Sequence, residues 1–129
     1  MWVINKENSR DLNFSLACIY CQAIDIEEFK KWIEIVIKET SIDELPNYIF
    51  DLVDFNEPLF HITNVIGFVP SNNLSKKDEY AIYGITYLRK KDVYDPPVSK
   101  EKALTALKKN PQVMKEFKRF FPFVKFESE

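Results

Sequence analysis

Residues 25 to 40 carry the feature that most constrains the fold, an apolar stripe with helical spacing. Its members are Ile26, Phe29, Trp32, Ile33, Val36 and Ile37, while Lys30, Lys31, Glu34 and Lys38 fill the opposite side. Such a pattern is typical of an amphipathic helix that lies against a core. We predict that Asp25 caps this helix and that Glu28 completes a capping box. Trp32 is expected to be a buried anchor whose indole N–H finds a hydrogen-bond acceptor.

Local signals predict further helices over the rest of the chain. Ser9, Ser41, Ser75 and Ser99 stand at N-cap positions, Pro46, Pro58 and Pro111 in first turns, and Gly67 at a helix end. The predicted helices cover about residues 10–22, 46–53, 58–66, 76–91, 100–109 and 111–121. Residues 80–88 also have the β-branched and aromatic bias of a strand. The capping serine, the charged flanks and the lack of a strand partner favour a helix there.

Length and glycine content point to the same fold class. A chain of 129 residues has the commonest size of a single domain. It contains only two glycines, whereas sandwiches and barrels use glycine at many turns. We therefore predict an all-α fold, a single compact domain of six or seven helices over residues 1–129.

Few residues stand in patterns that indicate catalysis or metal binding. Cys18 and Cys21 form a C-x-x-C pair, but no second ligand pair accompanies them, so we expect small buried thiols. His61 is the only histidine, and no known motif surrounds it. Asp51 and Asp54 share a helix face, but no Glu-x-x-His motif accompanies them. We predict no catalytic residue, no metal site and no cofactor.

The chain also lacks the usual sequence features of export and membrane insertion. Its first residues have neither a basic segment nor an apolar one of the signal-peptide kind. No apolar run approaches the roughly 18 residues of a membrane span. With its thiols expected to be reduced, we predict a cytoplasmic protein that makes no membrane contact.

Charge is strongly segregated along a chain that is nearly neutral overall. Residues 25–57 hold ten acidic and three basic side chains, a net charge of −7, and residues 75–125 hold thirteen basic and six acidic ones, a net charge of +7. Two interpretations stay open. Either the two segments pack together and offset each other, or they leave surface fields that steer partners. Tyr48, Phe50 and Phe55 lie among the acids, and interface cores favour aromatic residues.

Three segments, residues 23–32, 43–52 and 82–88, together resemble small bacterial immunity proteins. The similarity is to those that protect cells against polymorphic toxins, including toxins of contact-dependent growth inhibition. It is a similarity of layout over most of the chain and carries over no functional residue. It implies a protein that binds a cognate toxin protein and blocks its active site or substrate entry. Many such toxins are nucleases with basic surfaces, which an acidic patch would match.

We therefore predict a non-enzymatic immunity protein that binds its toxin through acidic residues and one aromatic anchor. The predicted partner-binding residues are Glu27, Glu28, Glu39, Asp43, Glu44, Tyr48, Asp51 and Asp54. One alternative is a helical adaptor or regulatory protein that binds another protein or nucleic acid through its basic C-terminal half. The sequence pI of 5.5 and the lack of a known motif disfavour nucleic acid. A small enzyme that uses His61 or the pair Asp51 and Asp54 is the least favoured alternative.

Overall fold

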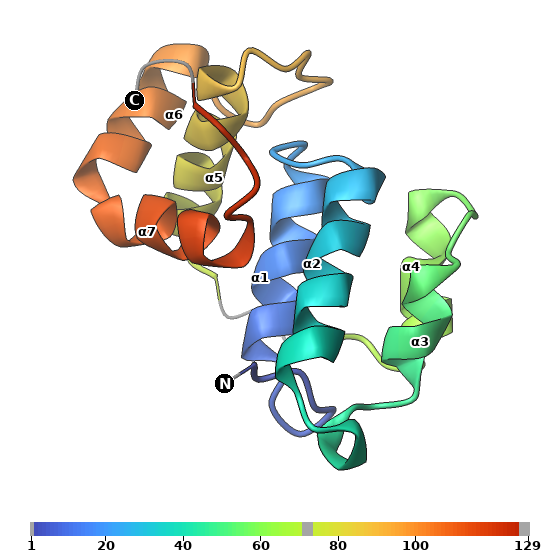
Figure 1. Cartoon of the computed structure of the whole chain (residues 1–129). Coiled ribbons are helices and arrows are strands. Elements are labelled where there is room, and N and C mark those ends of the chain that lie inside the picture. The colour runs from blue at the N-terminus through green and yellow to red at the C-terminus, as the bar shows by residue number, and fades with distance from the viewer. Residues whose placement is uncertain (1, 71–73, 127–129) are drawn as a thin grey trace.

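The fold consists of three groups of helices (Figure 1). The computed structural model describes residues 2–70 and 74–126. The helices there are α1 (Arg10–Tyr20), α2 (Ile26–Glu39), η1 (Ile42–Glu44), α3 (Tyr48–Val53), η2 (Leu59–His61), α4 (Ile62–Ile66), α5 (Lys76–Leu88), α6 (Lys100–Lys109) and α7 (Pro111–Phe120), of which η1 and η2 are short 3₁₀ helices. No strand occurs in these ranges, so the predicted all-α domain of six or seven helices is confirmed. The run from Pro70 to Ser75 is rich in turn residues and predicts a loop, but its residues 71–73 lie outside the described residues.

The antiparallel pair α1 and α2 occupies the middle of the molecule. Helices α3 and α4 lie on one flank of this pair, and α5, α6 and α7 lie on the other (Figure 1). The predicted capping box opens α2, because Asp25 Oδ1 accepts from the amide of Glu28 (2.8 Å) and Glu28 Oε1 accepts from the amide of Asp25 (3.0 Å). Ser75 and Ser99 cap α5 and α6 as predicted. Ser9 and Ser41 stand at N-cap positions, but their side chains make no capping hydrogen bond.

An aromatic cluster joins the central pair to α7. Trp32 is fully buried, and its ring stacks on Phe120 with a centroid distance of 5.6 Å and an interplanar angle of 10°. Trp2 meets both rings edge-on, at 5.6 Å from Trp32 and 4.9 Å from Phe120. The prediction of an acceptor for the Trp32 indole was wrong, since Nε1 is buried with no partner in the described residues. The indole of Trp2 instead donates to Glu39 Oε1 at 2.9 Å.

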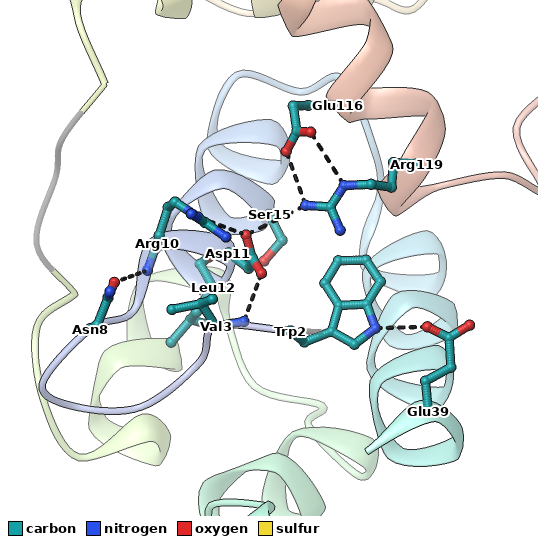
Figure 2. A network of polar contacts seen from close by, with 10 residues as sticks. All are labelled: Trp2, Val3, Asn8, Arg10, Asp11, Leu12, Ser15, Glu39, Glu116 and Arg119. Atoms are coloured by element: carbon teal, nitrogen blue, oxygen red, sulfur yellow. Dashed lines mark hydrogen bonds and ion pairs between the residues drawn. The ribbon is translucent and has the colours of Figure 1, made fainter.

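A buried carboxylate holds the N-terminal segment against α1 and α7. The side chain of Asp11 is only 2% exposed, and its Oδ2 accepts from the amide of Val3 at 2.7 Å. Its Oδ1 lies 3.3 Å from Arg10 Nε and 3.6 Å from Arg119 Nη2, and Arg119 also pairs with Glu116 (Figure 2). Two guanidinium groups therefore offset the charge of this internal acid, as a buried ion requires.

Helices α5 and α6 make a close backbone contact at Gly84. A Cβ atom at this position would lie 2.6 Å from the carbonyl oxygen of Ala103 and 2.9 Å from Cβ of Leu107. Real Cβ atoms do not approach a backbone oxygen so closely, so a side chain here would force the helices apart. Packing against α6 therefore explains this glycine within a helix.

Replacing Gly84 by alanine should lower the free energy of unfolding by about 1–3 kcal/mol, the usual cost of overpacking a core. Helix propensity alone would favour alanine by about 1 kcal/mol, so a net loss isolates the steric effect. Urea unfolding followed by far-ultraviolet circular dichroism measures the change. A variant as stable as the parent chain would contradict the close α5–α6 contact.

Gly67 supplies the matched control for this prediction. It ends α4 with a left-handed φ of 89°, and a Cβ there would meet no atom within 4 Å. Asparagine tolerates this backbone conformation better than other residues with a side chain. Gly67→Asn should therefore change the free energy of unfolding by less than about 1 kcal/mol.

Candidate protein-binding surface

The segment from Glu39 to Ser75 contains six acidic residues and no lysine or arginine. Its helices α3 and α4 form one flank of the molecule, while the basic segment forms α5, α6 and α7 on the opposite flank (Figure 1). The two charged flanks do not face each other, because the pair α1 and α2 lies between them. Arg89 and Arg119 of the basic half pair with Glu28 of α2 and Asp11 of α1. The two charged segments therefore pack together only in part, because α2 of the acidic segment contacts the basic segment through Glu28 and Trp32, whereas α3 and α4 lie on the far side of the central pair.

We define the acidic flank as the exposed acidic and large apolar side chains of η1, α3, η2 and the segment between α3 and η2. They are Ile42, Asp43, Glu44, Phe50, Asp51, Val53, Asp54, Glu57 and Phe60. Ile42 and Phe60 are each 75% exposed, and Phe50 is 43% exposed. The flank therefore exposes apolar side chains as well as carboxylates, and aromatic residues are enriched at protein interfaces.

The acids of this flank have few partners within the protein. The carboxylates of Asp43, Glu44, Asp51 and Asp54 make no hydrogen bond or ion pair with any residue that the structure describes. Glu57 contacts only His61, whose Nδ1 lies 3.0 Å from its Oε1. Asp43, Glu44, Asp51 and Asp54 therefore keep their carboxylates exposed and without a side-chain partner in the described part of the chain.

The predicted partner-binding residues are spread over more than one surface. Asp43, Glu44, Asp51 and Asp54 lie on the acidic flank. Glu27 and Glu39 are exposed near opposite ends of α2, about 18 Å apart along its axis at 1.5 Å per residue. Glu39 also accepts the Trp2 hydrogen bond. A single contact surface centred on α3 can include the four acids of the acidic flank, but it would have to be much larger to include both ends of α2 as well.

Tyr48 was predicted to be an exposed aromatic anchor, and this placement was wrong. Its side chain is buried, its hydroxyl donates to the carbonyl oxygen of Ile4, and Phe68 packs against its ring edge-on. Burial raises the pKa of the Tyr48 phenol. Of the three aromatic residues among the acids, Phe55 is buried too, and only Phe50 reaches the surface.

Glu28 was predicted to be a surface acid, and the structure places it in an internal ion pair instead. Arg89 Nη1 and Nη2 donate to its two carboxylate oxygens at 2.9 and 2.6 Å, and both side chains are only 15% exposed. Arg89 also donates to the carbonyl oxygen of Ala23 at 2.7 Å. Burial acts to raise the pKa of Glu28, but hydrogen bonds from Arg89 and the amide of Asp25, with the charges of Arg89 and Lys91, lower it overall.

The lowered pKa makes the Glu28–Arg89 pair a pH-dependent contribution to stability. A carboxyl group with a lower pKa in the folded state stabilises above its unfolded pKa of about 4.3, and the stabilisation is lost as pH falls through the folded pKa. Glu28→Gln should lower the free energy of unfolding by about 2–3 kcal/mol at pH 7, somewhat less than for a fully buried pair. Below pH 4 the difference between variant and parent should shrink.

Glu27→Gln is the control, because Glu27 precedes Glu28 on α2 but is exposed and makes no side-chain contact among the described residues. It should change the free energy of unfolding by less than about 0.5 kcal/mol at either pH. Urea titrations at pH 7 and pH 3.5 give both values. Equal effects of the two substitutions would mean that the Arg89 contact adds no stability.

The cysteine pair and the possible metal ligands can be located within the described residues. These residues contain no group of three or more histidine, cysteine, aspartate or glutamate side chains that could hold a metal ion. Cys18 and Cys21 are buried free thiols. Burial raises the pKa of both, that of Cys21 to about 12, so neither is an activated thiolate. In the same ranges, no helix has the length and apolar character needed to cross a membrane.

Sequence reasoning missed the exposed apolar part of the surface. In α3, Tyr48, Ile49 and Leu52 are buried, whereas Phe50 and Val53 are exposed. The sequence does contain a signal for this exposure, because Ile49 and Leu52 are three residues apart and so are Phe50 and Val53. This spacing gives α3 two apolar stripes, of which a six-residue helix can bury one.

The chain matches no protein-family model, no curated protein and no solved structure.

Proposed function

We propose that this protein is an immunity protein that binds a cognate bacterial toxin domain through the acidic flank and neutralises it by direct contact. The observation that carries the proposal is the set of unpaired carboxylates beside exposed Phe50 and Phe60 on a segment without lysine or arginine. Together they fit a basic partner with an apolar centre. The resemblance to immunity proteins supports the same function.

Inhibition through this surface requires no chemistry by the protein itself. The acidic flank would attract a basic toxin surface, speed their encounter and then cover the toxin's active site or substrate entry. A nuclease is a suitable toxin, because its substrate-binding surface must be basic to hold phosphates. The proposal includes a cytoplasmic location, where such a toxin would meet its substrate.

Co-expression with the product of the adjacent upstream gene tests this function. The tagged protein should recover a toxin domain in stoichiometric amount, and the complex should lack the toxic activity of the free domain. Recovery of nucleic acid or of unrelated proteins would contradict the proposal. A complex that kept full toxic activity would contradict neutralisation while leaving binding intact.

A second candidate is an adaptor that binds a polyanion through its basic half. It is favoured by a groove of about 540 Å³ between α5 and α6, to which Lys77, Lys102 and Lys109 contribute three positive charges and Glu101 one negative charge. Binding of a polyanion here should weaken steeply as salt rises, because counterions are released. Titration with heparin at 50 and 200 mM salt distinguishes the two functions, since the immunity function predicts no such binding.

A further inference from the structure

A groove of about 400 Å³ lies where the end of α1 and the start of α2 meet the segment between α3 and α4. Its apolar lining comes from Ile19, Ile26, Phe55 and Leu59. Two carboxylates, Glu27 and Glu57, also line it, together with Lys30. The groove continues the acidic flank, because Glu57 belongs to both. Its net charge is −1 among these residues.

The mixture of apolar and acidic groups restricts what the groove can hold. A purely apolar occupant would take water from Glu27 and Glu57 without replacing its hydrogen bonds. An acidic occupant would be repelled. A long side chain with an aliphatic stem and a cationic head satisfies both parts, with its stem on the apolar lining and its head at the carboxylates.

The state of the two carboxylates agrees with such an occupant. Glu27 has no side-chain partner among the described residues, and Glu57 contacts only His61. Lys30 lies one helical turn from Glu27 and also lines the groove, so the groove already has one cationic side chain at its edge. An arginine head fits better than a lysine head, because its planar fork donates several hydrogen bonds to two acceptors at once.

The geometry points to a pocket for an arginine side chain of the partner protein, with Glu27 and Glu57 binding the guanidinium and Ile26, Phe55 and Leu59 packing on the stem. This inference rests on the proposed function, since it specifies one contact within the toxin interface. It predicts that the toxin presents an arginine whose removal weakens the complex.

Pentylguanidinium, a small mimic of the arginine side chain, tests the pocket without any toxin. Titration at low salt, followed by the backbone amide signals of the labelled protein, should shift the signals of residues 26–30, 55–57 and 59 and leave those of α6 and α7 unchanged. Pentanol, which has the stem alone, should bind at least about tenfold more weakly, because a charged hydrogen bond contributes about 1.5–3 kcal/mol. Equal binding of the two probes would overturn the inference.

Two double variants separate the pocket from general attraction to an acidic protein. Glu27→Gln with Glu57→Gln should weaken pentylguanidinium binding about tenfold or more. Asp43→Asn with Glu44→Gln removes the same charge outside the groove and should leave the binding unchanged. Equal weakening by both pairs, or shifts spread over the whole acidic flank, would refute the pocket.

The double variant Glu27→Gln with Glu57→Gln also distinguishes failure of the pocket from failure of the proposed function. If the toxin complex forms but neither the probe nor the toxin responds to Glu27→Gln with Glu57→Gln, the pocket is wrong and the immunity function stands. If the probe binds as expected but no toxin is recovered from co-expression, the groove has its predicted chemistry and the immunity function fails.

Discussion

Replacing Trp32 by alanine should lower the free energy of unfolding by about 3–5 kcal/mol, the range for deleting a large buried aromatic side chain. Trp32 is fully buried, stacks on Phe120 and meets Trp2 edge-on, so its removal leaves a cavity between α2, α7 and the N-terminal segment. Domains of this size are stable by only about 5–15 kcal/mol. The variant should therefore unfold at a much lower urea concentration, measured by far-ultraviolet circular dichroism.

Trp32→Phe separates the packing of the ring from its unpaired N–H. Phenylalanine keeps a ring on Phe120 and removes a buried donor that has no acceptor in the described residues. It should cost less than about 2 kcal/mol, because the lost volume is partly offset by the donor that no longer needs a partner. A cost equal to that of alanine would show that the indole N–H is satisfied in solution.

Tyr94→Ala is the surface control for both substitutions. The Tyr94 side chain is 84% exposed, and its contacts with Gln22 are made by backbone atoms that alanine retains. A change below about 0.5 kcal/mol is expected. A large effect of Tyr94→Ala would mean that losing even an exposed aromatic side chain destabilises the protein. The cost of Trp32→Ala could then not be assigned to the burial of Trp32.

The helices were predictable because their signals are local. Asp25, Ser75 and Ser99 each sit three residues from the amide that they cap, and the long apolar stripe of α2 repeats over several turns. The prediction that Ser9 caps α1 was wrong, although serine is a favoured N-cap residue. The Ser9 backbone, with φ −113° and ψ 32°, lies outside the extended region that lets an N-cap side chain turn back to the helix.

The errors at the candidate site come from contacts between residues far apart in sequence. Glu28 meets Arg89 across 61 positions, and Tyr48 meets Ile4 across 44. The capping box marks Glu28, but no local pattern reveals that its carboxylate also meets Arg89. Periodicity also fails in α3, because six residues make fewer than two turns and leave the buried stripe ambiguous. The charge segregation is visible in the sequence, but where the two segments meet depends on distant contacts, so both interpretations stayed open.

Reversing two charges on α3, Asp51→Lys with Asp54→Lys, should weaken binding to the cognate toxin at least about 100-fold. Coupling between close charge pairs at an interface is about 1.5–7 kcal/mol, and each 1.4 kcal/mol is a factor of ten. Neither acid has a side-chain partner in the described part of the chain, so reversal removes attraction, adds repulsion and breaks no internal contact. Calorimetric titration of the toxin domain measures the loss, with circular dichroism to verify the fold.

The control makes the same change of charge on the opposite flank, with Asp92→Lys and Glu101→Lys, both exposed. It should weaken toxin binding less than about threefold if the acidic flank is the interface. The adaptor function predicts the reverse result, since Glu101 lines the lysine groove and its reversal would strengthen heparin binding. Equal loss of toxin binding in both variants would mean that only net charge matters, and the choice of flank would be wrong.

The apolar members of the flank should act on a different rate constant. Phe60→Ala should raise the dissociation rate of the toxin complex about tenfold or more, because a buried aromatic anchor commonly contributes about 2 kcal/mol. The charge reversals should instead lower the association rate and reduce its dependence on salt. Phe60 is 75% exposed, so its removal should leave the unfolding free energy nearly unchanged. Unchanged dissociation with Phe60→Ala would place the apolar centre of the interface elsewhere on the flank.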